Sequence, residues 1–488
     1  MYIRKLTIEN FKGFEGNHVF DFDKNLVFFV GDNNCGKSTT FESIEFLRSG
    51  LPANKSVGDI TNKKTKGQVS VIAELHENIK SVINDFSETK YLKYVFEEDG
   101  VEKLIIKRSS EEKTIKQDGK DRNLNIKTIT LWNSETKQFE NPAGIDTVFR
   151  TLFESQFIWA DTNPEDITDF GATKICGRLL SSTIGNFFDT SQWKKFKEIF
   201  DETFATGDDN FSKRTELLGK KITDIINSQY GQADVSFKFE LPDASSFIKT
   251  GCIDIDDGSG VTSSKDKGTG MQRALALALI QIYADLLTKH PEDPEKLKPL
   301  FLFVDEPETF LHPYAQEKLL NALMVISVNR QIFVCTHSPY LLRSFNKNNH
   351  ILYVFRKNDT SNSAQPSKDL DLFQASSPTW GEINYFAFGL LSPEFHNELY
   401  GFLQARAIDE NGQNEKCDLF DKYLDAHGIQ SDLDWIHEKP SGDIKYKVPL
   451  QTYIRNSIHH PENTKNIPYT HEQLGQSIEK LIEILRVK

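Results

Sequence analysis

The chain has 488 residues, enough for about two to four domains and a sizeable core. Its 58 basic and 71 acidic side chains give a net charge of −13, so the overall field does not attract nucleic acid. The five cysteines are scattered and never spaced as CxxC, which argues against a disulfide framework and a zinc site.

Long apolar segments are missing from the sequence. No stretch approaches the roughly 18 apolar residues that a membrane-spanning helix needs, and the amino terminus lacks a signal peptide's apolar core. We therefore expect a cytoplasmic protein with no membrane partner. The lysine-rich stretches 62–66 and 103–120 could touch phosphates, although a solvated hairpin is the favoured interpretation.

A phosphate-binding loop is the clearest motif. The apolar run Leu26–Val30 leads into Gly31-Asp-Asn-Asn-Cys-Gly-Lys-Ser38, and a helix-like segment follows. A strand, a glycine-bounded loop and a helix start point backbone N–H groups at one spot, which attracts phosphate. Lys37 supplies a positive charge for the β- and γ-phosphates, and the Ser38 hydroxyl is placed to bind Mg²⁺. The motif predicts nucleoside triphosphate binding.

The segments around this loop predict strands first and helices later. The first 30 residues favour two or three short strands. An antiparallel lobe is expected over 68–136, with strands at Val69–Ala73, Tyr91–Phe96, Leu104–Lys107 and Ile129–Trp132. Apolar residues at helical spacing over 192–230 predict a short helical hairpin.

The next part of the sequence predicts a βαβ unit. Alternation at Val235–Phe239 predicts a strand, and Met271–His290 is rich in helix formers. The continuous apolar runs Leu300–Val304 and Gln331–Cys335 are typical of strands buried on both faces of a parallel sheet. A helix is expected between them, at Tyr314–Ile326.

The tail is expected to form a separate, mainly helical domain. Residues 358–368 are polar and rich in helix breakers, so we place a boundary there. Thr470–Gln473 has the spacing of a capping box and opens an amphipathic helix. The sequence thus predicts four parts: 1–190, 191–232, 233–357 and 358–488.

The ends of two predicted strands carry further candidate residues for Mg²⁺ binding and hydrolysis. The run Phe301–Val304 ends in Asp305 and Glu306, and the run Phe333–Cys335 leads to His337. If these strands lie beside the strand before the phosphate loop, Asp305 reaches the Mg²⁺ and Glu306 can polarise the attacking water. His337 would then stand at the sheet edge where ligands bind in open α/β sheets.

The order of these motifs resembles that of the ABC-type ATPases, in the branch that holds SMC, RecF and the OLD-like proteins. Between the phosphate loop and the acids, Lys267-Gly-Thr-Gly-Met-Gln-Arg273 is similar to the family's glycine signature. Ile3–Phe14 looks like the opening strand and turn of the branch, and Asp305–Pro313 like its acidic strand with a D-loop. The resemblance implies an α/β ATPase head with a mixed sheet, an antiparallel β lobe and a helical insertion.

The resemblance also implies roles for single residues. The phosphates of ATP would be held by Gly31, Asp32, Asn33, Asn34, Cys35, Gly36, Lys37, Ser38 and Thr39, with Lys12 touching the nucleotide nearby. Ser38 and Asp305 would serve Mg²⁺, Glu306 would be the general base, and His337 would sense the γ-phosphate. The ATP of a second copy would be contacted by Gly268, Thr269, Gly270 and Gln272, which implies a head-to-tail dimer. Gln156 is a candidate metal contact, with an ordinary surface residue as the alternative.

Two departures from the family shape the functional hypothesis. No long heptad array separates Lys37 from Asp305, which disfavours a long-armed SMC protein. The tail also lacks the strand pattern of the Toprim nuclease domain that OLD nucleases carry. The chain therefore resembles the ATPase subunits of antiviral systems of the PARIS and Septu types. This implies a sensor or scaffold that holds a separate nuclease partner, with a phage protein as its trigger.

Two alternatives stay open. Arg455-Asn-Ser-Ile-His459 resembles the motif of HEPN ribonucleases, and a helix would place Arg455 and His459 on one face. A structural cap is the other interpretation of that segment. A RecF-like DNA-repair ATPase would bind DNA, which the acidic net charge disfavours.

Overall fold

The chain forms two compact units, Met1–Ala160 with Lys298–Lys488, and Asp161–Leu297. The computed structural model describes every residue except 161–167, 172–175, 178, 181–186, 188–189, 207–209, 230, 242–243, 259, 289–298, 310, 358–360, 412–416, 440–441 and 487–488. The predicted division into four parts stays a prediction.

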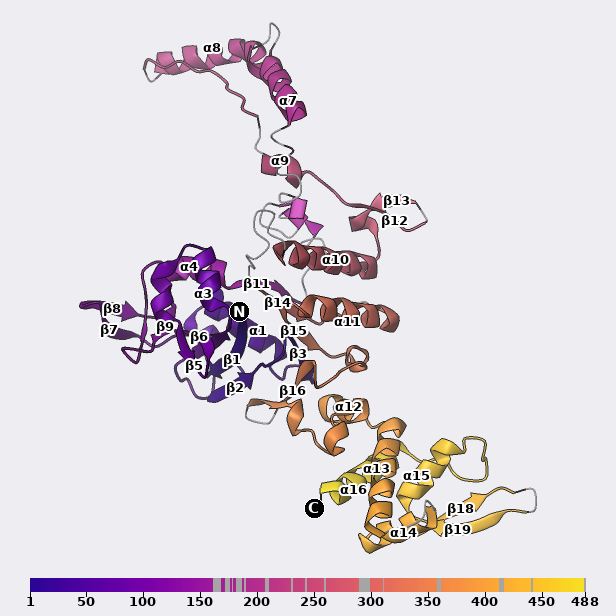
Figure 1. Cartoon of the computed structure of the whole chain (residues 1–488). Coiled ribbons are helices and arrows are strands. Elements are labelled where there is room, and N and C mark those ends of the chain that lie inside the picture. Colours follow the sequence, from indigo (N-terminus) through magenta and orange to yellow (C-terminus); the bar gives the residue numbers. More distant parts are fainter. Residues whose placement is uncertain are drawn as a thin grey trace. The chain divides into compact units, whose positions relative to one another are not determined.

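A six-stranded, mostly parallel sheet lies at the centre of the first unit (Figure 1). Its order is β11 (Glu154–Ile158), β14 (Leu300–Asp305), β15 (Gln331–Thr336), β3 (Leu26–Gly31), β16 (His350–Lys357) and β17 (Asn362–Pro366). Only the pair β16–β17 is antiparallel. Every residue of β3, β14 and β15 is buried, which explains their continuous apolar runs.

Helices join the strands of this sheet and cover it. Helix α1 (Lys37–Ser49) follows β3, and its Phe41 ring lies 5.3 Å from the Phe303 ring of β14. Helix α11 (Pro313–Ser327) connects β14 to β15 and buries four apolar side chains, Leu319, Leu320, Leu323 and Ile326. The predicted βαβ unit is therefore present.

A second, antiparallel sheet forms the β lobe. Its order is β10 (Gln138–Glu140), β9 (Thr130–Asn133), β6 (Val101–Ser109), β4 (Ser70–His76), β1 (Tyr2–Glu9) and β2 (Asn17–Asp21), and β5 (Phe96–Glu98) pairs with β6. The hairpin of β7 (Lys113–Gln117) and β8 (Lys120–Leu124) projects from it (Figure 1). One face of the lobe shares its hydrophobic core with α1 and the parallel sheet. The mixed sheet and the antiparallel lobe were both expected.

The expected strand Tyr91–Phe96 is wrong over most of its length. Residues Thr89–Tyr94 form a 3-10 helix, and only Phe96–Glu98 is a strand. The reason is that Tyr91 and Tyr94, three residues apart, are both buried, which a strand would place on opposite faces. The β lobe also contains short helices that had no prediction, α2 (Val57–Ile60), α3 (Ile79–Asp85) and α4 (Ile145–Leu152).

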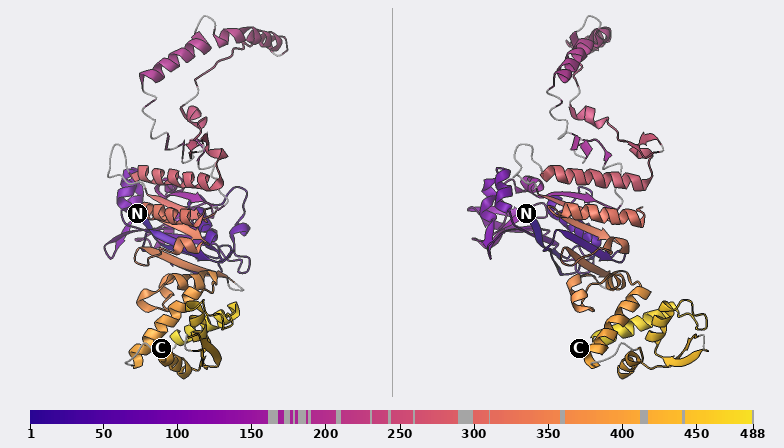
Figure 2. Two further views of the ribbon diagram at one scale, coloured as in Figure 1. Left: turned by 90° about the vertical axis from the view of Figure 1, so that its right-hand side faces the viewer. Right: turned by 45° about the vertical axis from the view of Figure 1, so that its right-hand side comes forward.

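The second unit holds two helices where a helical hairpin was expected, and Figures 1 and 2 show them splayed apart rather than side by side. Helix α7 (Ser191–Asp201) continues into a π-helical turn (Glu202–Thr206), and α8 (Phe211–Gln229) follows. Part of the connecting turn, 207–209, lies outside the described residues. The unit also contains α9 (Ala244–Lys249), the hairpin β12 (Asp254–Asp256) and β13 (Val261–Ser263), a 3-10 turn (Ser264–Asp266), and α10 (Thr269–Thr288), which was predicted.

The expected strand Val235–Phe239 is wrong, because these residues have no regular structure and no partner strand. The segment lies along α8 instead. The Val235 N–H donates to the Thr223 hydroxyl over 2.9 Å, and the Phe239 ring packs 4.8 Å from that of Phe211. Alternation of aromatic residues makes a strand only where another strand edge can pair with it.

The residues after β17 are mainly helical, as predicted. They form α12 (Trp380–Phe388), α13 (Pro393–Asn411), α14 (Cys417–Ala426), α15 (Leu450–His459) and α16 (His471–Arg486), with the hairpin β18 (Leu433–His437) and β19 (Ile444–Val448). Two 3-10 turns, at Ser367–Asp369 and Gln374–Ser376, lie between β17 and α12, and another, at Pro339–Leu342, lies between β15 and β16. Figure 2 shows these helices gathered beyond the β16–β17 edge of the parallel sheet.

Part of the stretch 358–368, where the sequence suggested a boundary, forms β17, which pairs with β16 of the parallel sheet. The polar composition of this segment fits an edge strand whose side chains are mostly only partly buried. Among the described residues, no helix is both long and apolar enough to cross a membrane.

Candidate nucleotide site

The phosphate loop joins the end of β3 to the start of α1. Gly31 has a φ of +136°, and a Cβ atom there would lie 2.1 Å from the Phe355 carbonyl oxygen on β16. Gly36 also has a left-handed φ, of +105°, and precedes the first helical residue, Lys37. No side chain caps α1 among the described residues, so its first N–H groups face the loop. The geometry is that of an anion site.

Lys37 supplies the positive charge of this site. Its side chain is buried, and its ammonium group donates to the carbonyl oxygens of Gly31, over 2.9 Å, and Asp32, over 2.8 Å. The ammonium group also lies 3.6 Å from the Cys35 sulfur. These contacts hold the charge inside the loop, next to the N-terminus of α1.

Asp305 lies beside the loop because three parallel strands end at the same level. It pairs with Cys335 of β15, whose own partner is Phe29 of β3. Burial raises the pKa of Asp305, while a hydrogen bond from the Ser38 hydroxyl opposes that shift. Among the described residues, the buried Oδ1 of Asp305 has no hydrogen-bond partner. A carboxylate oxygen and a hydroxyl placed together fit the oxygen ligands that Mg²⁺ prefers.

Glu306 follows β14 and turns sharply out of the sheet. Its φ is +47°, an uncommon left-handed conformation for glutamate, and its N–H donates to the Cys335 carbonyl oxygen over 2.9 Å. Its Oε1 lies 3.6 Å from Nε2 of His337. The two side chains are 37% and 29% exposed, so water can reach both. A carboxylate in this position can accept a proton from a water molecule.

The third group is His337, at the end of β15. Burial lowers the pKa of its imidazole, and the charge of Lys37 lowers it further. Glu306 and a hydrogen bond with the Gly31 backbone act in the opposite direction. The ring is therefore neutral near pH 7 and links the end of β15 to the phosphate loop.

Two residues that the sequence analysis did not assign also belong to the site. Glu308 accepts the backbone N–H of His337 over 2.7 Å, and burial raises the pKa of its carboxyl group. Asn362 of β17 is buried, and its Nδ2 would lie 2.8 Å from a Cβ atom at Gly36. The sequence signal for Glu308 is that three of the four residues before Thr309 are acidic, whereas Asn362 stands in a polar stretch that gives no signal.

Of two further predicted site residues, Gln156 lies away from these groups, whereas Lys12 lies close to the phosphate loop, since the carbonyl oxygen of the next residue, Gly13, accepts the Asn362 N–H over 3.1 Å. The ammonium group of Lys12 pairs with Glu42 of α1 over 2.5 Å. Gln156 pairs with Leu302 in the middle of β11 and β14, three residues before Asp305. Because side chains alternate along a strand, its side chain faces away from that of Asp305. The structure does not bring Gln156 to Ser38 and Asp305.

The predicted glycine signature lies in the second unit, at the start of α10. The Gly268 carbonyl oxygen accepts the N–H groups of Met271 and Gln272 over 2.9 and 3.1 Å. The Gln272 side chain donates to the carbonyl oxygens of Lys265 and Lys267, both over 2.9 Å, and so holds the preceding turn. Gly268 and Thr269 are exposed at the helix start. Their contact with ATP stays a prediction.

The parallel sheet, the phosphate loop and the groups at its strand ends define a P-loop ATPase of the ABC type. The chain belongs to the AAA ATPase domain family, which matches residues 1–342. The predicted likeness to the OLD-like ABC-type ATPases is confirmed by this match together with the two nuclease relatives that follow.

The relatives include two nucleases. The Old nuclease of Escherichia phage P2 is 26% identical over 362 residues, which cover 72% of this chain and 59% of that protein. Endonuclease GajA of Bacillus cereus (strain HuB5-5) is 21% identical over 427 residues, which cover 74% of this chain and 61% of that protein. The chain thus spans about three-fifths of the length of both relatives.

Solved structures with a similar fold include SMC head domains. An SMC head bound to the C-winged helix domain of ScpA is 18% identical and covers 75% of this chain and 97% of its own, with a TM-score of 0.42. The SMC head domain from Thermotoga maritima is 15% identical and covers 75% of this chain and 99% of its own, with a TM-score of 0.34.

Titration of His337 tests the geometry of the site. Glu306→Gln removes a charge that raises the pKa of His337, so that pKa should fall further below 6.5. Lys37→Ala removes a charge that lowers the pKa, which should therefore rise. Imidazole NMR signals across pH, assigned with a His337→Asn variant, report both shifts. Equal pKa values in all three proteins would contradict the placement of these groups.

Proposed function

We propose that this chain is an ATP-hydrolysing sensor or scaffold subunit of a bacterial antiviral complex. The observation that carries the proposal is the meeting of Lys37, Asp305, Glu306 and His337 at one edge of the parallel sheet. Membership of the AAA ATPase domain family and the OLD-like relatives support it.

In the proposed reaction, the N–H groups of the phosphate loop and Lys37 bind the β- and γ-phosphates. Ser38 and Asp305 would hold a Mg²⁺ ion, which neutralises charge on the phosphate oxygens when bound. Glu306 accepts a proton from the attacking water, and its exposed carboxylate suits that role. His337 contacts the γ-phosphate from the end of β15, in a position that Glu308 fixes through the backbone.

The ATP site is proposed to be completed by a second copy of the chain. The N-terminus of α10, with Gly268 and Thr269 exposed, has the N–H groups and dipole that attract an anion. A head-to-tail dimer would bring this turn of one copy to the γ-phosphate held by the other. Binding and hydrolysis of ATP would then control the assembly of the two copies.

The partner in the proposed complex is a separate nuclease, with a phage protein as trigger. After β17, the described residues form helices α12–α16 and one antiparallel hairpin, an architecture unlike a Toprim nuclease domain. The relatives carry the names of nucleases, and we assign cleavage in this system to a second protein. The mainly helical C-terminal region offers a surface for that protein.

Replacement of Glu306 tests the catalytic assignment. Glu306→Gln should reduce ATP turnover by about 100-fold or more while ATP still binds, because only the proton acceptor is removed. The trapped ATP should also increase the dimer fraction, measured as mass in light scattering. A matched control is Glu317→Gln, on the exposed face of α11, which should leave turnover unchanged. Normal turnover in Glu306→Gln would contradict the assignment.

A second candidate function is an ATP-gated ribonuclease in the tail. The structure places Arg455 and His459 one turn apart on α15. Burial lowers the pKa of His459, and the nearby Arg455 charge lowers it further, which favours a neutral imidazole that can act as a base.

Incubation of the purified chain with RNA separates this candidate from the first. Cleavage by the natural chain and its loss in Arg455→Ala would support the ribonuclease. Intact RNA in both samples, with and without ATP, would exclude it. Lys445→Ala is a suitable control, since this exposed residue changes the charge of the same region outside α15.

A further inference from the structure

A pocket of about 220 Å³ opens on the outer face of the β lobe, under the β7–β8 hairpin. Its floor comes from β6, β9 and β10, and its wall from Lys113, Ile115 and Leu124 of the hairpin. Successive side chains of a strand point to opposite faces of the sheet. Ile106 and Leu131 therefore enter the hydrophobic core, whereas Lys107 faces the pocket. The pocket is separate from the nucleotide site.

The floor of the pocket carries two aromatic rings. Trp132 of β9 and Phe139 of β10 pair edge to face, with 5.2 Å between ring centroids. The Lys107 ammonium group lies 5.5 Å from the centroid of the Phe139 ring. Both residues are only partly buried and line the pocket, so part of the aromatic surface is open to a ligand.

The charge of the pocket is opposite to that of the whole chain. Lys107, Lys113 and Lys137 line it, and Glu111 is the acidic residue among its lining. None of the three lysines has an ion-pair partner in the part of the chain that the structure describes. A local positive field of this kind attracts phosphate in spite of a net charge of −13.

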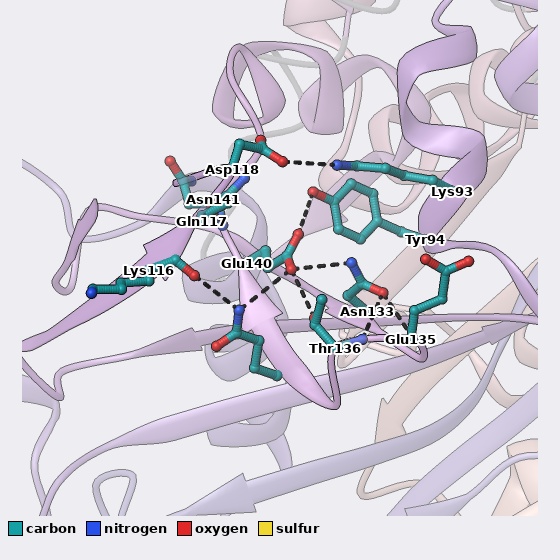
Figure 3. Close-up of polar contacts among 11 residues, drawn as sticks. Lys93, Tyr94, Lys116, Gln117, Asp118, Asn133, Glu135, Thr136, Glu140 and Asn141 are labelled. Carbon is teal, nitrogen blue, oxygen red and sulfur yellow. Dashed lines mark hydrogen bonds and ion pairs between the residues drawn. The ribbon is translucent and has the colours of Figure 1, made fainter. Parts of the chain in front are cut away.

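A buried polar network holds the hairpin over the pocket (Figure 3). The Glu140 carboxylate accepts hydrogen bonds from Tyr94, Asn133 and Thr136, over 2.9, 3.1 and 2.8 Å. Gln138 donates to the Lys116 carbonyl oxygen of the hairpin over 3.1 Å.

Burial acts to raise the pKa of Glu140, but these donors outweigh it and hold the pKa below its usual value. The carboxylate therefore stays charged and fixes the turn between β9 and β10, next to Gln138, which contacts the β7–β8 hairpin. The buried Gln117 side chain adds a second tie, since its Oε1 accepts the Asn141 N–H over 3.0 Å. The pocket is thus preformed.

We propose that this pocket binds a segment of single-stranded nucleic acid. Lysines around exposed aromatic rings combine phosphate attraction with base stacking, the two contacts that single strands offer. The pocket is smaller than the roughly 300–1,000 Å³ of typical small-molecule sites, which suits one base of a longer polymer. A duplex presents paired bases that cannot stack on Trp132. This binding does not depend on ATP hydrolysis.

A binding experiment with the full chain and a labelled single strand of about 20 nucleotides tests the proposal. Fluorescence anisotropy measures the affinity. Oligothymidylate and oligouridylate distinguish DNA from RNA. Three phosphate contacts predict a slope of about −2 for log affinity against log salt concentration. The double variant Lys113→Glu with Lys137→Glu reverses the charge of two of these contacts. The dependence on salt should then become weaker, with a slope of about −0.7.

Two further variants complete the experiment. Trp132→Leu keeps an apolar side chain but removes the stacking face, and should weaken binding about fivefold or more. Lys55→Glu with Lys439→Glu makes the same charge change at exposed positions outside the pocket, and should leave affinity nearly unchanged. Unchanged ATP turnover shows that each variant is folded, since none of these residues belongs to the nucleotide site.

Three results would overturn the proposal: no binding of either strand, equal loss of affinity in the control pair, or an unchanged affinity in Trp132→Leu. A glutamate-rich peptide that binds as tightly as the oligonucleotides and competes with them would also overturn it, in favour of an acidic protein segment.

Discussion

The hydrogen-bond register of β14, β15 and β3 is the constraint on which the nucleotide site depends. It places Asp305 beside Cys335, and Thr336 beside Val30, so that the groups after each strand emerge at one edge. A shift of one residue would turn Asp305 to the opposite face. The close approach of Gly31 to the Phe355 carbonyl oxygen adds a second constraint, because a side chain at Gly31 would separate β3 from β16.

The sequence predicted those parts of the fold whose signals are local. The phosphate loop, α10, α11 and α16 each carry their own pattern of apolar residues, caps and glycines within one segment. The continuous apolar runs of β14 and β15 indicated a parallel sheet for the same reason. The sequence alone places Asp305 and Glu306 at a strand end near the phosphate loop, since the chain direction of parallel strands fixes which ends meet.

Features that depend on distant partners could not be predicted. Val235–Phe239 alternates like a strand but packs along α8, and Tyr91 and Tyr94 are buried on a 3-10 turn. Asn362 lies next to the phosphate loop and comes from a stretch whose composition suggested a domain boundary. The candidate metal contact Gln156 rests on its position in the chain alone. The register of β11 with β14 decides toward which face of the sheet its side chain points. In each case the information lies in tertiary pairing and not in the segment itself.

The central claim is that the phosphate loop of one copy and the glycine signature of another form a single ATP site. The most direct test co-expresses two variants, Lys37→Ala and Gly268→Asp, each of which should be inactive alone. In a head-to-tail dimer the mixed pair restores one intact site, so turnover should recover to about a quarter of that of the natural chain. An inactive mixture, or a Gly268→Asp protein with full turnover, would contradict the claim.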